Sequence, residues 1–95
     1  MIRHLIVFNA DAPPQRVREM AERGKRDLST IPGVTDVRFG EALGNAARYR
    51  YVFDIGFVDE ATIERYRTHP THVRFAEEHF RPLAHDRITT DYRVE

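Results

Sequence analysis

Residues 49–58 read Tyr49-Arg-Tyr-Val-Phe-Asp-Ile-Gly-Phe-Val58, and this stretch decides the fold. Every second side chain in it is large and apolar. Because successive side chains of a β-strand point to opposite faces of a sheet, the alternation predicts a strand with one apolar face. We expect that face to form strand core or a subunit contact, with one end lining an apolar pocket. The row is Tyr49, Tyr51, Phe53, Ile55 and Phe57.

The chain opens with a second strand-like stretch, residues 1–8, which is largely apolar on both faces. Such a strand is typical of a sheet that is covered on both sides. One face carries Ile2, His4, Ile6 and Phe8, and the other carries Arg3, Leu5 and Val7.

Helical periodicity follows the first strand. Asp11 is placed to cap a helix that opens at the two prolines after it and is stopped by Ile31-Pro-Gly33. The apolar positions of this helix follow the i, i+3, i+4 pattern of an amphipathic helix. They are Val17, Met20, Ala21, Gly24 and Leu28.

The remaining segments are one strand on each side of a helical region. We expect strands at 34–41 and 87–94, a short helix at 59–66 capped by Asp59, and a helix at 70–84 opened by Pro70. The last helix has the apolar line Val73, Ala76, Phe80 and Leu83, and the last strand has Ile88, Thr90, Tyr92 and Val94 on one side.

The order strand–helix–strand–strand–helix–helix–strand is the split βαβ pattern. It predicts an α+β, ferredoxin-like protomer with a four-stranded antiparallel sheet and helices on one face. The predicted helices can cover only one face of the sheet, yet the first and third strands carry apolar side chains on both of their faces. An uncovered apolar face needs a partner, and the simplest partner is the same face of a second copy. We therefore expect a homodimer.

Composition excludes several classes of protein. The chain has 95 residues, which is room for one domain, taken as residues 1–95. Its 15 Lys and Arg balance 15 Asp and Glu, which argues against a nucleic-acid module. It has no cysteine, and no apolar run or N-terminal layout suggests a membrane span or a signal peptide. We expect a cytoplasmic protein with no membrane partner.

Five stretches together resemble the family of stress-responsive dimeric α/β-barrel (Dabb) proteins. The resemblance covers essentially the whole chain, and its most specific part is a His-Pro-x-His run after a helix, combined with a histidine in the N-terminal strand. The stretches are Ile2-Arg-His-Leu-Ile-Val-Phe8, Ile31-Pro-Gly-Val34, the strand ending at Phe57, Tyr66-Arg-Thr-His-Pro-Thr-His-Val-Arg-Phe75 and Asp91-Tyr92.

The resemblance implies a protomer whose sheet pairs with a second protomer to close a dimeric α/β barrel. Many family members have no assigned activity. A few plant members are enzymes, among them hydroxynitrile lyases and a polyketide cyclase that forms olivetolic acid. In the cyclase a tyrosine and a histidine act together; they match Tyr66 and His72, and its strand histidine matches His4. His69 matches the first histidine of the run, whereas Tyr51 stands where the cyclase has a histidine.

These residue types suit proton transfer at a carbonyl compound. An aldol-type cyclisation needs a base that works near neutral pH and a donor for the developing oxyanion, and histidine and tyrosine supply them. Tyr66 and His72 lie on either side of Pro70, so helical spacing alone does not bring them together. The structural alternative is that Tyr66 packs against the sheet and His72 bonds a local backbone carbonyl.

The other histidines have two interpretations each. His4 either faces the same cavity or is a core histidine with one hydrogen bond, since a polar group at a buried strand position is costly unless satisfied. His69, next to Pro70, is placed to cap the last helix. His69, His72 and His79 fall roughly on one helical face, but without a cysteine or a His-Glu-x-x-His run we expect no metal site and no cofactor.

Three functions stay open from the sequence. The first is a cofactor-free cyclase or lyase that acts on a small carbonyl or polyketide-like substrate, with His72 as base and Tyr66, aided by His4, as donor. The second is a non-catalytic binding protein for a small apolar ligand, and the third is a structural stress-response oligomer. In the first two we expect the ligand to be lined by Tyr51, His69, Phe8, Phe53 and Phe75.

Overall fold

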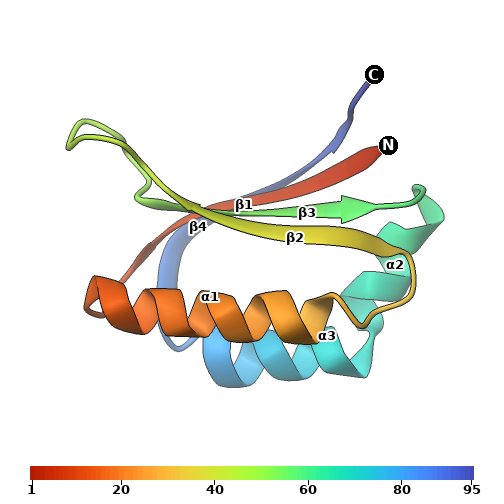
Figure 1. The fold of residues 1–95 in the computed structure, drawn as a ribbon, viewed down its shortest axis with the longest axis horizontal. Helices are drawn as coiled ribbons and strands as arrows, with labels where there is room; N and C mark the ends of the chain where they lie inside the picture. The colour runs from red at the N-terminus through yellow and green to blue at the C-terminus, as the bar shows by residue number, and fades with distance from the viewer.

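The computed structural model describes residues 1–95 and confirms the α+β ferredoxin-like fold. Its strands are β1 (Ile2–Ala10), β2 (Val34–Glu41), β3 (Tyr51–Phe57) and β4 (Ala84–Arg93). They form one antiparallel sheet in the order β2-β3-β1-β4. The helices α1 (Pro14–Leu28), α2 (Ala61–Thr68) and α3 (Pro70–Phe75) all lie on one side of this sheet, as Figure 1 shows. None of them is long and apolar enough to span a membrane.

The core fills the space between the sheet and these helices. The inward faces of β1 and β3 supply Ile2, Phe8, Phe53, Ile55 and Phe57, all 5% exposed or less. The strand pairing aligns these residues: Ile2 stands opposite Phe57, and Ile6 opposite Phe53. Of the predicted row of aromatic side chains on β3, Phe53 and Phe57 are therefore core, Tyr51 is partly buried against the core, and Tyr49 lies outside the strand.

β3 begins two residues later than predicted, at Tyr51. The backbone N–H of Arg50 donates to the Asn9 side-chain oxygen at 3.0 Å, so a side chain from β1 takes the place of a ladder bond there. Tyr49 lies outside the strand. The Arg48 guanidinium lies over the Tyr49 ring, with its carbon 5.1 Å from the ring centroid.

The predicted cap of α1 is wrong. Pro13, not Asp11, occupies the N-cap position, and no side chain caps this helix. Asp11 lies too far ahead of the first helical residue, because Pro13 keeps the chain extended. Its backbone N–H instead donates to the Leu83 carbonyl oxygen at 3.0 Å. Asp59 does accept a hydrogen bond at the start of α2, from the Thr62 N–H at 3.0 Å.

The predicted helix 70–84 is interrupted by a π-helical turn over Ala76–Phe80, in which the Arg81 N–H donates to the Ala76 carbonyl oxygen at 2.8 Å. In an uninterrupted α-helix, side chains seven residues apart point in directions that differ by only about 20° around the helix axis. Val73 would then face inward with Phe80. The extra residue of the π turn rotates the preceding segment by about 100°. His72 and Phe75 turn inward instead, and Val73 is 37% exposed. The predicted apolar line is wrong at Val73 and holds for the other three residues.

The sheet face away from the helices carries no element of this chain (Figure 1). The strand pairing places a band of apolar side chains across its middle and toward β4: Leu5, Val7, Val52, Ile88 and Tyr92. The predicted faces of the first and last strands agree with this pairing.

An ion-pair network lies beside this band. The Arg3 side chain is 12% exposed, and its guanidinium contacts Asp36 at 2.8 Å and Asp54 at 2.7 Å. Gly56 makes room for it, since a Cβ there would stand 2.2 Å from Asp36 Oδ1 and 2.5 Å from Arg3 Nη1. The hydrogen bond from Arg3 lowers the pKa of the Asp36 carboxyl below its ordinary value.

Replacing Arg3 by methionine is expected to lower the free energy of unfolding at pH 7 by about 1–2 kcal/mol. Because the pKa of Asp36 is depressed in the folded state, its contribution is present above the ordinary value of 3.8 and is lost as pH falls through the lower folded-state pKa. As the pH falls below about 4, the free energy of unfolding of the variant should therefore decrease less than that of the parent protein. Urea unfolding at several pH values measures both effects. Arg38→Met is the control, because Arg38 also pairs with Asp36 but from a side chain that is 73% exposed.

Candidate functional site

Four elements bring polar side chains together at one end of the core. His4 comes from β1, Tyr66 from α2, His72 from α3 and Asp91 from β4. The rings of Tyr66 and His72 are 4.3 Å apart between centroids, and those of Tyr66 and His4 are 5.5 Å apart. The structure therefore places the three residues predicted as catalytic in one cluster, with Tyr66 between the two histidines.

Tyr66 is 2% exposed, but its hydroxyl makes no hydrogen bond within the chain. The hydroxyl oxygen is not sealed off, since no fully buried side-chain oxygen lacks a partner. Burial, reinforced by the charge of Asp91, raises the pKa of Tyr66 above its usual range. Tyr66 is thus held protonated, with a hydroxyl that is available to donate to a ligand or to water.

His72 is half-buried, and its Nδ1 lies 3.0 Å from the Arg67 carbonyl oxygen. A carbonyl oxygen only accepts, so Nδ1 carries the hydrogen and Nε2 of the neutral ring keeps its lone pair. Burial lowers the pKa of His72 below its ordinary value, against the opposing effect of the Arg67 bond. The local carbonyl contact considered as the structural alternative is therefore present, and it also prepares the ring to act as a base.

His4 donates through Nδ1 to Asp91 Oδ1, at 2.5 Å. Its ring stacks on Phe57, 5.5 Å between centroids, and meets the Tyr66 ring edge-on. The sequence interpretation missed Asp91 as part of this cluster. The sequence did hold a signal for it. Because Ile88, Thr90 and Tyr92 lie on one face of β4, Asp91 must lie on the other face. In the structure it stands there opposite His4 on β1.

Tyr66 and His72 line an apolar cavity between the helices and the sheet. Eight of its nine lining residues are hydrophobic, and among them are the predicted ligand-lining residues Phe53 and Phe75. Its volume is about 20 Å³, which is room for about one water molecule. Only a small group of a ligand, such as a carbonyl, fits there without movement of the side chains.

A second, polar hollow of about 280 Å³ lies outside this cavity. His72 and Ala76 line both spaces, so they form the wall between them. The hollow also carries Arg67, Glu77 and Arg81. The Arg67 guanidinium is paired with Glu64 on its own helix, whereas Arg81 takes part in no ion pair and its charge acts on His72. A ligand with a polar body and a small carbonyl group matches this pair of spaces better than a wholly apolar one.

Three predicted ligand-lining residues lie elsewhere. Phe8 is fully buried, and Tyr51 packs between it and Phe39, with ring centroids 5.5 and 5.7 Å away. Neither lines the cavity or the hollow. His69 caps α3, as predicted: its Nδ1 accepts from the Thr71 N–H at 3.1 Å. No group of three His, Cys, Asp or Glu side chains in the structure is arranged to hold a metal ion.

Comparisons with known proteins agree with this fold. The family model described as the stress responsive A/B barrel domain matches residues 2–94. A search of curated proteins finds no match. Among solved structures, a Dabb family protein with a ferredoxin-like fold from Mesorhizobium loti is 28% identical, with a TM-score of 0.87, over 99% of this chain and 96% of its own.

Two further structures are similar at lower identity and indicate the fold alone. A dimeric ferredoxin-like protein of unknown function from Thermobifida fusca is 23% identical, with a TM-score of 0.83, over 98% of this chain and 90% of its own. The hydroxynitrile lyase of Passiflora edulis is 16% identical, with a TM-score of 0.83, over 99% of this chain and 93% of its own. The fold is thus used both by an enzyme and by proteins without an assigned activity.

Proposed function

Because the chain belongs to the family of stress-responsive A/B barrel domain proteins, we propose that it is a small cofactor-independent enzyme of the cyclase or lyase type. The observation that carries the proposal is the opposite tuning of two groups at one cavity. His72 is kept neutral with a free Nε2 lone pair, and Tyr66 is kept protonated with a free hydroxyl. Titratable groups whose environments push them into opposite roles are typical of an acid–base pair.

The proposed chemistry takes place at a carbonyl. His72 Nε2 removes a proton from the carbon beside the carbonyl, and the Tyr66 hydroxyl donates to the enolate oxygen that forms. The enolate carbon then adds to a second carbonyl carbon, and the resulting alkoxide takes up a proton. In the lyase direction, His72 takes the proton of a hydroxyl group, and a carbonyl forms at the carbon that carried this hydroxyl. The bond from this carbon to its neighbouring carbon breaks, and the neighbouring carbon leaves with the electron pair as a stabilised carbanion, which takes up the proton from His72.

His4 and Asp91 have a supporting role in this proposal. The Asp91 carboxylate fixes the His4 ring through Nδ1, and the His4 ring then packs against Tyr66. The body of the substrate occupies the outer hollow beside Arg81, and its carbonyl enters the inner cavity past His72. Small carbonyl or polyketide-like compounds with a polar or anionic end fit this division.

A non-catalytic protein that binds a small apolar ligand is the second candidate. The apolar lining of the inner cavity favours it, and the small volume of that cavity counts against it. The two candidates differ in one measurable respect: only the enzyme speeds the exchange of a carbon-bound proton.

We also propose that the protein is a cytoplasmic homodimer whose two uncovered sheet faces pack together to close the barrel. The band of apolar side chains on that face supports the dimer, as does the description of the Thermobifida fusca protein as dimeric.

The proposed base makes a prediction about pH. The lowered pKa of His72 means that its Nε2 lone pair is retained below pH 6.5, the ordinary value for histidine. We expect its ring to titrate below 6.5 in a ¹³C NMR titration. The protein should also speed deuterium exchange of 2,4-pentanedione in heavy water, with the acidic limb of its pH–rate profile at that same lowered value. A ring that titrates at or above 6.5 would contradict the tuning described here.

A further inference from the structure

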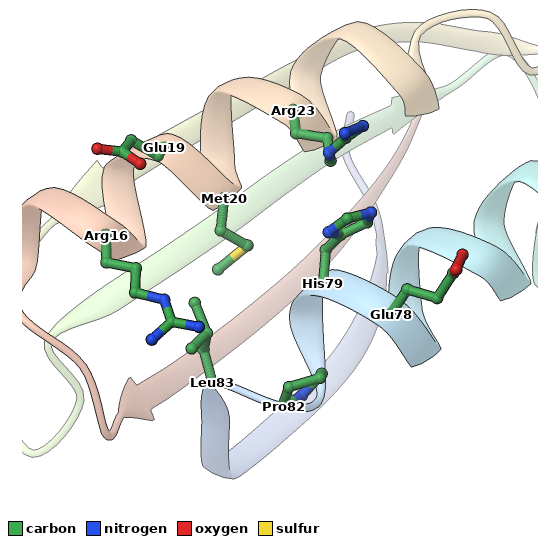
Figure 2. A pocket seen from close by; sticks show the side chains of 8 residues that line it. All are labelled: Arg16, Glu19, Met20, Arg23, Glu78, His79, Pro82 and Leu83. Carbon is green, nitrogen blue, oxygen red and sulfur yellow. The ribbon is translucent and has the colours of Figure 1, made fainter.

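A groove separate from the candidate site runs between α1 and the π turn. It has a volume of about 230 Å³ and shares no lining residue with the inner cavity or the outer hollow. Figure 2 shows its eight lining side chains, four from α1 and four from the segment that runs from the π turn to the start of β4.

The two ends of the groove are basic. Arg16 lies toward the end of the groove where Leu83 is drawn, and Arg23 lies toward the other end, on the side of His79 (Figure 2). Arg16 and Arg23 are seven residues apart on α1, which separates their backbones by about 10.5 Å along the helix axis. The structure therefore offers two positive positions rather than one cluster.

Apolar side chains form the middle of the groove. Met20 points into it between the two arginines, and Leu83 lies opposite. Both are largely buried, at 6% and 8% exposure, so they form a floor rather than a flexible rim. A ligand that lies between the two arginines therefore contacts apolar surface along its length.

The basic groups are free to bind an anion. Arg16 takes part in no ion pair, and Arg23 has only Asp27, at 3.9 Å. Both carboxylates of the groove have partners outside it. Glu19 accepts from Gln15, and Glu78 lies 3.9 Å from Arg74. In Figure 2 both carboxylates point away from the space between the arginines.

We propose that this groove binds a linear dicarboxylate, with one carboxylate on Arg16, the other on Arg23 and His79, and the apolar chain over Met20 and Leu83. A guanidinium group recognises a carboxylate through two parallel hydrogen bonds, and His79 adds a ring N–H. His79 belongs to the π turn, a feature that is frequent at functional sites.

Calorimetric titration with adipate tests the proposal, with hexanoate as the ligand of equal chain length and one carboxylate. We expect saturable adipate binding at one site per chain, at least about tenfold tighter than hexanoate binding. Arg16→Gln and Arg23→Gln should each weaken adipate binding about tenfold or more, and each should reduce the preference over hexanoate. The matched control is Arg26→Gln, which changes the same charge on an exposed position of the same helix outside the groove and should leave binding unchanged.

Several results would overturn the assignment. One is the absence of saturable adipate binding at millimolar concentration. Equal affinity for adipate, hexanoate and inorganic phosphate would show that the groove does not read two carboxylates. Equal weakening by Arg16→Gln and Arg26→Gln would show that only the net charge matters. Circular dichroism melting confirms that each of these surface variants is folded.

Discussion

Replacing His72 by asparagine is expected to lower the rate of 2,4-pentanedione proton exchange by about 100- to 10,000-fold. The asparagine side-chain amide can still donate to the Arg67 carbonyl oxygen, so the variant loses the lone pair of Nε2 and keeps the local contact. Exchange is followed by ¹H NMR in heavy water, near pH 7. His69→Asn is the matched control, because His69 caps α3 and lines neither space, and asparagine is a good capping residue.

Tyr66→Phe separates the two halves of the proposed pair. It removes the hydroxyl and leaves the ring that packs against His4 and His72, so its effect reports the stabilisation of the oxyanion, about 100- to 1,000-fold for one donor. If His72→Asn exchanged protons at the parent rate, as the control His69→Asn is expected to do, the enzyme proposal would fail. The protein would then be better described as a binding or structural member of its family.

Replacing Val7 by aspartate is expected to convert the proposed homodimer to a monomer. Val7 lies in the apolar band of the uncovered sheet face, opposite Val52 on one side and Ile88 on the other. A two-fold contact through this face would bury the new carboxylate twice, once in each subunit, without a partner. Sedimentation velocity measures the result, and we expect the dimer to be undetectable at micromolar concentration.

The same substitution on the helical side supplies the control. Val73 is exposed on α3, so Val73→Asp places an equal charge away from the proposed contact. A parent protein that sediments as a monomer, or a Val7→Asp variant that stays dimeric, would remove the barrel from the proposal. The acid–base cluster is formed within one chain and does not depend on that outcome.

Much of the fold follows from side-chain alternation. The strand at 34–41 was predicted with its observed bounds, and the row on β3 was predicted from period-two spacing alone. These predictions succeed because a half-buried strand leaves a direct trace in the sequence. Helix caps are harder to predict from the sequence. Asp59 and Asp11 both precede a helix, but only Asp59 accepts a hydrogen bond from its first turn, because the prolines after Asp11 keep Asp11 away from α1.

The candidate site was harder to predict because it depends on rotation and register. Tyr66 and His72 are brought together by the bend at His69-Pro70 and by the π turn beyond it, and no simple periodicity describes either. The His4–Asp91 contact joins residues 87 positions apart through the pairing of β1 with β4. The resemblance to the family gave roles to His4, Tyr66 and His72, but it gave none to Asp91, which it included only within a matching stretch.

The π turn also bears on how such a chain can change by insertion and deletion. Removing one residue from the exposed part of the turn, at Glu77 or Glu78, would restore an ordinary α-helix without disturbing Phe80 and the strand that follows. In the shortened helix His72 would stand seven residues before Phe80 and Phe75 four residues before it. Both side chains would therefore keep facing the cavity, because these spacings return to nearly the same side of an α-helix. The π turn thus accommodates one extra residue without changing which side chains face inward, so relatives that differ by one residue here can share both the architecture and the place of the proposed base.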